Sequence, residues 1–264
     1  MSEVLADDLA RVAGLVSYLV VPLNPTGEEW ISAEALVSDS SFLRAQIDAT
    51  AGGRGTDDPA VSASMFVQSY AFGLAAATLA PLVLTGRVPV AAPDRVMLRI
   101  AQNRPSGMGL LTPIVHAGPF NEPAVFDWLA DTLFAGHLDR LVDAVRETVK
   151  VGERLLWGNI ASSCVTIFRT IEGALTGREE KLRIRTFTTA FLGSMPHEFA
   201  SLGSFLTLNV GDSEGWYHER TTCCLWYKTA EALRASVAYC GDCSLTPTTE
   251  RCATLLLELA SKDA

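Results

Sequence analysis

The chain has 264 residues, of which 48% are apolar and 19% are charged, and it contains six cysteines. This composition is typical of a globular protein and excludes collagen and intrinsic disorder. The formal net charge of −9 argues against nucleic acid or an anionic membrane as the main partner, because both attract basic surfaces. A chain of this length buries roughly three quarters of the surface that it exposes when unfolded, so we do not expect the cysteines to act as staples.

The N-terminal residues predict a cytosolic protein. They read MSEVLADDLARVAG, which is acidic where a secretory leader is basic. The most apolar segment, 71–84, contains Pro81 and is shorter than the ~20 residues that span a bilayer. We therefore expect a buried core helix and no integral membrane segment. In a cytosolic protein, clustered cysteines indicate metal ligation or redox chemistry before disulfides.

Helical periodicity dominates the first two thirds of the chain. Apolar residues at three- and four-residue steps predict a helix over about 3–20, and a short helix is expected from Ser32. Residues 48–59 contain three glycines and two adjacent aspartates, which predicts a loop. Further helices are expected over the following ranges: 59–81; Asn121, as the N-cap, to Val149 with a weakening at Gly136; and 150–175, closed by Gly177.

Two segment pairs predict antiparallel strands. In the first, the strands flank Arg104–Gly107, and in the second, which is the weaker signal, they flank Gly211–Gly215. The expected strands are 96–100 with 110–115, and 205–210 with 219–227. No phosphate-binding glycine loop and no internal repeat is present, so the sequence predicts one mainly α domain over 1–264 with a small antiparallel β element.

Four of the six cysteines fall within 21 residues, in the pattern C-C-x15-C-x2-C formed by Cys223, Cys224, Cys240 and Cys243. The C-x2-C half places two thiolates on one tight turn, which suits zinc, iron–sulfur clusters and redox disulfides alike. Adjacent side chains of a strand point to opposite faces, so Cys223 and Cys224 reach one metal centre only if the backbone turns there. A structural zinc normally avoids this with C-x2-4-C on both sides. A two-iron cluster offers four ligand positions over a wider body.

The cysteine segment resembles the FhuF-like ferric-siderophore reductases. The resemblance is carried by RTTCCLWYK over 220–228 and CGDCSL over 240–245. Weaker signatures are SMFVQSY over 64–70 and ERLLWGN over 153–159. Together these segments extend the likeness over about 60–245, and its specific part is the cysteine motif.

The resemblance implies that Cys223, Cys224, Cys240 and Cys243 bind one [2Fe–2S] cluster within a C-terminal segment, 216–246. The gap between the two halves is fifteen residues here instead of the family's ten. The additional sequence, 229–238, favours helix and is expected to project beside the cluster. The alternative is a structural zinc bound by the same four cysteines in a non-catalytic protein that binds a siderophore or a protein partner.

The remaining candidate residues are assigned lesser roles. Cys164 lies in an apolar helical run and is expected in the core, and Cys252 is expected to pack on a terminal helix that begins near Pro247. His218 is not needed as a ligand. Four aromatic side chains bracket the motif and are expected to pack around the β element or to shield the cluster: Trp216, Tyr217, Trp226 and Tyr227. His116, His137 and His197 show no metal-like spacing.

The resemblance also implies the chemistry. A [2Fe–2S] cluster passes one electron at a time, at a potential on the order of −400 mV, and one electron releases iron from a ferric siderophore as weakly held Fe(II). The net charge of −9 favours a neutral or cationic ferric hydroxamate over a triply negative catecholate. Since no nucleotide-binding fingerprint is present, the expected electron donor is a ferredoxin, a flavodoxin or a separate reductase.

Overall fold

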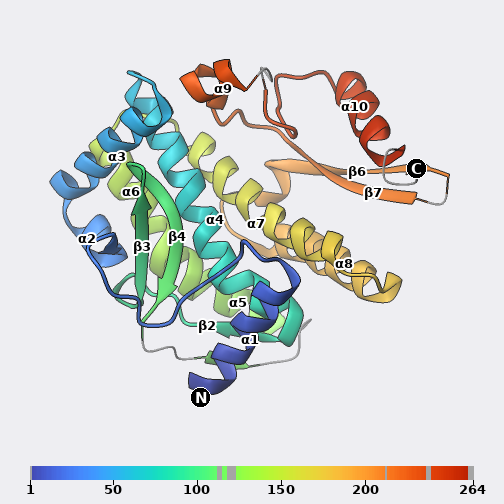
Figure 1. Cartoon of the computed structure of the whole chain (residues 1–264), viewed down its shortest axis with the longest axis horizontal. Coiled ribbons are helices and arrows are strands. Elements are labelled where there is room, and N and C mark those ends of the chain that lie inside the picture. Colours follow the sequence, from blue (N-terminus) through green and yellow to red (C-terminus); the bar gives the residue numbers. More distant parts are fainter. Residues whose placement is uncertain (1, 112–114, 118–122, 212, 236–238, 261–264) are drawn as a thin grey trace.

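The structure is a computed structural model, and it describes residues 2–111, 115–117, 123–211, 213–235 and 239–260. The chain is mainly helical with small antiparallel sheets, which confirms the expected fold class in this respect. Figure 1 shows a helical body built around α4 and α7, with the β6–β7 ribbon, α9 and α10 along one side of it. The Asn121 N-cap that the sequence predicts lies outside the described residues.

The helices differ widely in length. They are α1 (Ser2–Leu15), α2 (Ala33–Ser38), α3 (Ser40–Arg54), α4 (Pro59–Thr85), α5 (Pro123–Leu129), α6 (Asp139–Thr148), α7 (Glu153–Ala174), α8 (Arg178–Ser194), α9 (Ala230–Arg234) and α10 (Thr248–Ala260). Between α5 and α6 the helix widens into a π-helical segment, Ala130–Leu138, which contains Gly136 and coincides with the expected weakening.

The strands form three separate antiparallel sheets in the described part of the chain. The first has the order β1 (Trp30–Ser32), β3 (Val96–Ala101), β4 (Arg104–Leu110); the second pairs β2 (Arg87–Pro89) with β5 (Val115–Ala117); the third pairs β6 (Gly203–Val210) with β7 (Ser213–Arg220). In the third sheet, Phe205 lies opposite His218. The β element is therefore more divided than the sequence predicts.

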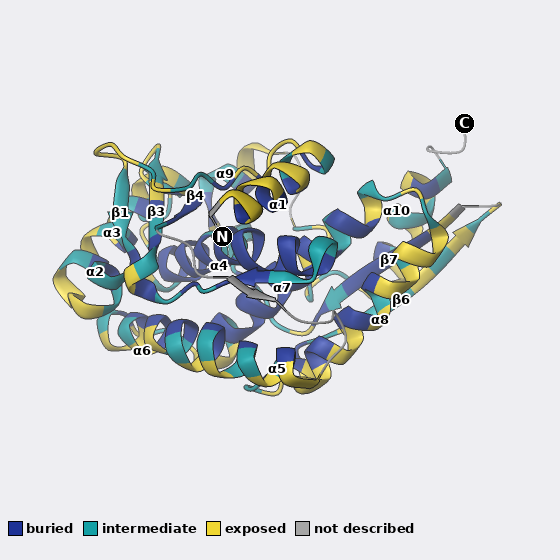
Figure 2. Cartoon of the chain, turned by 90° about the horizontal axis from the view of Figure 1, so that it is seen from below, coloured by how far each residue is buried: buried dark blue, intermediate teal, exposed yellow. Residues whose placement is uncertain are grey.

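The helix α4 is the centre of the core. Asp58 caps its first turn by accepting a hydrogen bond from the Ala60 amide, and Gly86 ends it in the left-handed conformation at φ 72°. Residues from every face of α4 are buried, and Figure 2 shows α4 and α7 as the most deeply buried helices. α4 continues past Pro81 to Thr85, beyond the predicted end. By length and composition this helix could cross a membrane, and 72% of its most apolar window is buried inside the protein.

Two predicted boundaries in the N-terminal half are wrong. The first helix ends at Leu15, although Val16 and Leu19 remain buried. Residues 48–54 belong to α3 and not to a loop. Gly53 has a packing role in this helix, because a Cβ there would lie 2.8 Å from the carbonyl oxygen of Gln102.

The strand pairs form in both predicted places but with other turns. The first turn consists of Gln102 and Asn103, at φ 51° and 59°, the left-handed pair that a type I′ hairpin requires. Residues 104–107 therefore belong to β4, and β3 pairs with 104–110 instead of the predicted strand 110–115. Of that predicted strand, residues 112–114 lie outside the described residues, and Val115 pairs in the second sheet. In the second pair, β7 covers 213–220 and not 219–227. Gly177 caps the start of α8 and does not close α7, which ends at Ala174.

Candidate functional site

The loop that follows β7 carries the adjacent cysteines. β7 ends at Arg220, and Leu225 adopts the left-handed conformation at φ 66°, which is costly for a residue with a branched side chain. The backbone therefore turns at Cys223–Cys224, as the adjacent pair requires. Cys224 is 2% exposed, whereas Cys223 is half-buried and its Sγ accepts a hydrogen bond of 3.4 Å from the Leu225 amide.

The second cysteine loop is a tight turn. The Cys243 amide donates to the Cys240 carbonyl at 3.0 Å, and the Leu245 amide lies 3.4 Å from the Cys243 sulfur. Arg251 of α10 donates to the Cys243 carbonyl and pairs with Glu219 of β7 at 2.5 Å. This turn is therefore held between the β6–β7 ribbon and the last helix.

The structure brings one thiol of each loop together. The Sγ atoms of Cys224 and Cys240 lie 3.8 Å apart, and two sulfurs bound tetrahedrally at about 2.3 Å from one metal are spaced by about 3.8 Å. The hydrogen bond with Cys240 lowers the pKa of the Cys224 thiol to about 6 and raises that of Cys240. Burial, and then the charges of Cys224 and Cys243, raise the pKa of Cys223. Within the described residues, no three cysteine, histidine or carboxylate side chains converge as a closed metal site.

A buried polar network fixes the position of Cys224. The hydroxyl of Ser64 in α4 donates to the Cys224 carbonyl at 2.6 Å. Asn159 of α7 donates to the Ser64 hydroxyl at 2.8 Å and accepts from Arg220 of β7 at 2.5 Å. Asn159 and Ser64 are fully buried. Two core helices and the end of β7 thus hold the cysteine loop through one chain of hydrogen bonds.

A second set of polar contacts holds the Cys240–Cys243 turn against α7. The hydroxyl of Ser162 donates to Asp242 at 2.8 Å, and Nδ1 of His218 lies 3.8 Å from the same carboxylate oxygen. Burial alone would raise the pKa of Asp242, but His218, Arg220 and Ser162 lower it below its usual value. His218 is 5% exposed, so it lies inside the site beside the cysteines.

Several buried donors around the cysteine loops have no partner. Nε and Nη1 of Arg220, Nε of Arg251 and the hydroxyl of Thr222 make no hydrogen bond with any described residue. Unpaired buried donors are costly, and an anionic group bound by the cysteines would offset part of that cost. Gly158 of α7 allows the close approach of this loop, because a Cβ there would overlap the Thr222 side chain.

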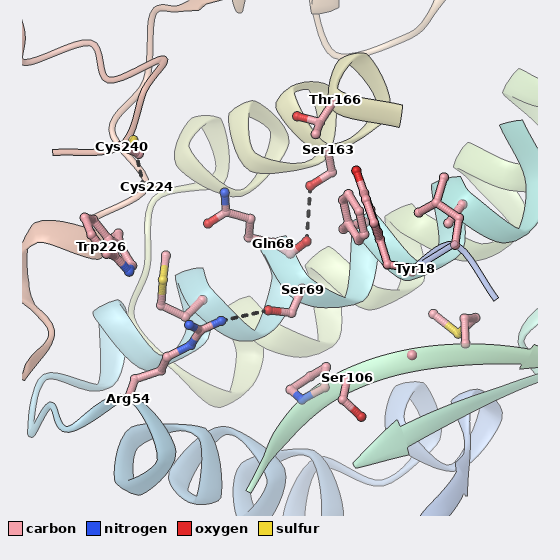
Figure 3. A pocket seen from close by; sticks show the side chains of 18 of the residues that line it. Tyr18, Arg54, Gln68, Ser69, Ser106, Ser163, Thr166, Cys224, Trp226 and Cys240 are labelled. Atoms are coloured by element: carbon pink, nitrogen blue, oxygen red, sulfur yellow. Dashed lines mark hydrogen bonds between the residues drawn. The ribbon is translucent and has the colours of Figure 1, made fainter. Parts of the chain in front are cut away.

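A cavity of about 670 Å³ opens beside the Cys224–Cys240 pair. Its walls come from residues 18–21, α3, α4, β4, α7 and the two cysteine loops, and Cys224, Trp226 and Cys240 line it. Figure 3 shows the two cysteines at one end of the cavity and Tyr18 at the opposite end. A mostly apolar cavity of this size matches the dimensions of sites for small organic ligands.

Arg54 of α3 is the single charged residue among the described residues that line the cavity. It pairs with Glu231 of α9 and donates to the Ser69 hydroxyl at 3.3 Å. Glu231 has a second cation, Arg104 of β4, at 3.3 Å. The segment between the two cysteine loops is thus attached to the helical body by ion pairs.

The other residues that the sequence singled out lie as follows. Cys164 is buried in the core, as expected, and burial raises the pKa of its thiol to about 12. Cys252 is half-buried on α10. Trp216 stacks on Phe205 at 4.4 Å, so of the four aromatic residues Trp216 packs against the β element and Trp226 lines the cavity.

Sequence reasoning did not find Arg54, Asn159 or Ser162. Asn159 lies within one of the quoted signatures, and both α7 residues are polar in an otherwise apolar helix. A buried polar residue requires a partner, and this is the signal that could have identified Asn159 and Ser162. Arg54 carries no such signal, because the sequence predicts a loop at this position.

Residues 64–192 match the family described as ferric iron reductase FhuF-like transporter. Over these residues the chain is similar to the FhuF-like family, which confirms the resemblance. The match covers α4 to α8, including Ser64, Asn159 and Ser162, and it ends before the four motif cysteines. No curated protein matches the chain.

Proposed function

We propose that this protein is a cytosolic ferric-siderophore reductase. The four cysteines, Cys223, Cys224, Cys240 and Cys243, hold a [2Fe–2S] cluster that reduces a ferric siderophore, preferably a hydroxamate, and releases Fe(II). The match to the FhuF-like family supports a role in ferric iron handling. The observation that carries the proposal is the opening of the Cys224–Cys240 pair into a cavity large enough for a small organic complex.

The residues around the cysteines fit an anionic cluster. The 3.8 Å between Cys224 and Cys240 matches two ligands of one tetrahedral metal. The donors of Arg220 and Thr222 that have no partner among the described residues are available to hydrogen-bond such a cluster. Hydrogen bonds to the sulfurs are among the factors that set the reduction potential of a cluster. The amides of Leu225 and Leu245 supply two of them.

The cluster, when bound, supplies a single electron, which converts the Fe(III) of the substrate complex to Fe(II). The protein contributes position and environment. Ser64, Asn159 and Arg220 hold Cys224 at the wall of the cavity, and the apolar side chains of the wall limit access of water. No nucleophile or base is required, because no bond to carbon is broken.

The charges near the cysteines are consistent with a hydroxamate substrate. Three basic residues flank the motif: Arg220, Lys228 and Arg234. Lys228 pairs with Asp58 at 3.5 Å, and none of the three lines the cavity. The overall charge of −9 then repels a triply negative ferric catecholate more than a neutral ferric hydroxamate. Faster reduction of the catecholate complex at low salt would contradict this preference.

The electron reaches the protein from outside. We propose a ferredoxin, a flavodoxin or a separate reductase as the donor, because the sequence holds no nucleotide-binding fingerprint for its own flavin or nicotinamide. A membrane helix is not part of the proposal. α4, the one helix within the described ranges that is both long and apolar enough to cross a membrane, is mostly buried in the protein.

The visible and electron paramagnetic resonance spectra of anaerobically purified protein test the cluster. We expect reddish-brown protein with two irons per chain, bleached by dithionite, and a reduced-state signal that Cys→Ser changes at the four positions abolish. The competing proposal is a structural zinc in a non-catalytic binding protein, which the 3.8 Å sulfur spacing also suits. Colourless protein with one zinc per chain would establish that alternative, and loss of the signal in Cys252→Ser but not in one motif variant would show a different ligand set.

A further inference from the structure

We infer that the cavity beside Cys224 and Cys240 binds the intact ferric complex, and that Arg54 is the residue that orients the complex by hydrogen bonding to its iron-bound oxygens. This inference rests on the proposed function and adds the place and polarity of substrate binding to it. A positioned donor at this point brings the oxygen-rich face of a hydroxamate complex towards the protein interior and leaves its organic part against the apolar wall.

Arg54 has the hydrogen-bonding capacity for this role. Its Nε is buried and has no partner among the described residues, while one of its other nitrogens contacts Glu231 and another contacts Ser69 at 3.3 Å. Its side chain is 16% exposed, so the charge is only partly hydrated. Hydrogen bonds from a partly buried guanidinium to anionic oxygens are among the stronger polar contacts in proteins.

The ion-pair geometry leaves Arg54 available to a ligand. Glu231 is shared between Arg54 and Arg104, so the three side chains carry one net positive charge. Arg104 does not line the cavity. When a ligand oxygen accepts from Arg54, Glu231 still retains Arg104 as its partner.

The other residues that line the cavity include both polar and apolar side chains. Gln68 of α4 lines the cavity (Figure 3), and its side-chain amide makes no hydrogen bond within the part of the chain that the structure describes. Met65, Phe72 and Met108 supply apolar wall. Tyr18, 66% exposed, stands at the outer end. Such a surface suits a complex with one compact oxygen-rich centre and an apolar organic spacer.

The inference is tested by binding of a complex that cannot be reduced. The probe is the gallium(III) complex of desferrioxamine, a linear trihydroxamate, because Ga(III) has the charge and nearly the size of Fe(III) but accepts no electron at biological potentials. Isothermal titration calorimetry on the cluster-loaded protein measures its dissociation constant. Arg54→Gln is expected to weaken binding at least about tenfold, the effect of losing one charge-assisted hydrogen bond.

Two matched controls separate contact with the ligand from attachment of α9. Arg104→Gln removes the other cation of Glu231 but none of the cavity wall, and Arg140→Gln removes a similar ion pair, with Glu34 at 2.8 Å, elsewhere in the fold. Both are expected to bind the gallium complex within about threefold of the wild type. Equal weakening in Arg54→Gln and Arg104→Gln would overturn the inference, because it would show an effect of α9 attachment only.

A fourth variant tests the cavity itself. Ser106 is exposed on β4 at the cavity wall, so Ser106→Trp is expected to fold and to abolish binding while the visible spectrum stays unchanged. Unchanged binding in Ser106→Trp, or no binding by the wild type, would overturn the inference. Failure of the proposed function gives a different result: the gallium complex binds with the expected dependence on Arg54 and Ser106, but dithionite-reduced protein does not reduce the ferric complex.

Discussion

Replacement of Asn159 by leucine tests the network that fixes Cys224. Asn159 is fully buried and makes two hydrogen bonds to Ser64, at 2.8 and 3.1 Å, and one with Arg220, at 2.5 Å. Leucine has a similar volume, so the change removes the hydrogen bonds with little loss of packing. It also leaves the Arg220 guanidinium without any hydrogen-bond acceptor among the described residues.

The expected loss of stability follows from the number and kind of these bonds. Two neutral hydrogen bonds contribute about 1 kcal/mol each and one to a charged group contributes about 1.5–3 kcal/mol, so the free energy of unfolding should fall by about 4 kcal/mol. For 264 residues, an unfolding entropy of about 2.1 cal/mol/K per residue gives about 0.55 kcal/mol/K, and the midpoint temperature should fall by about 7 °C.

The assay is urea unfolding followed by circular dichroism at 222 nm. The control is Thr78→Val, which removes one buried hydrogen bond within α4, from the Thr78 hydroxyl to the Leu74 carbonyl at 2.7 Å. It should cost about 1 kcal/mol or less. We also expect Asn159→Leu to shorten the lifetime of the visible absorption in the presence of an iron chelator, whereas Thr78→Val leaves it unchanged. An unfolding free energy for Asn159→Leu within about 1 kcal/mol of the wild type would refute this account of the network.

Three further predictions concern other parts of the fold. Gly158→Ala should destabilise the protein by about 1–3 kcal/mol and disturb the cysteine loop, because the added Cβ overlaps Thr222. Its control is Gly173→Ala on the same helix, which has no atom within 4 Å of the added Cβ and should be neutral or stabilising by up to about 1 kcal/mol. Equal unfolding free energies of the two variants in urea would contradict the prediction for Gly158. Burial lowers the pKa of His137 to about 4, so between pH 6.5 and 4 the unfolded chain takes up the proton first, and the free energy of unfolding should fall by about 3 kcal/mol as the pH drops. Urea unfolding across this range should show a smaller slope of the unfolding free energy against pH in His137→Gln. An identical slope would count against burial of the neutral ring. Burial raises the pKa of Cys164 to about 12, so its thiol should resist iodoacetamide in the native protein, and Cys164→Ala should keep the visible spectrum; rapid labelling of Cys164 without unfolding would contradict its place in the core.

The sequence was sufficient for the helical class of the fold and for the core helix α4, but it predicted a strand through Cys223–Cys224, where the structure has a turn. It was insufficient where tertiary contacts override local propensity. Gly52 and Gly53 weaken a helix in isolation, but α3 continues through them because it packs against the β3–β4 turn.

In the candidate site, too, the features that are local in the sequence could be predicted, and those that tertiary contacts create could not. The cysteine spacing identified the two loops, since a motif is local in the sequence. The cavity could not be found in this way, because its walls come from residues 18–21, α3, α4, β4 and α7, which only the folded chain brings together. Arg54 in particular reaches the site from a segment that the sequence assigned to a loop.

A single-turnover reaction tests the central claim most directly. The protein is reduced with dithionite, freed of excess reductant under anaerobic conditions and mixed with a ferric trihydroxamate in the presence of an Fe(II)-specific chromogenic chelator. We predict one Fe(II) captured for each cluster oxidised, and none with the Cys224→Ser or Cys240→Ser protein. Oxidation of the protein without Fe(II) release, or Fe(II) release that persists in these variants, would contradict the account.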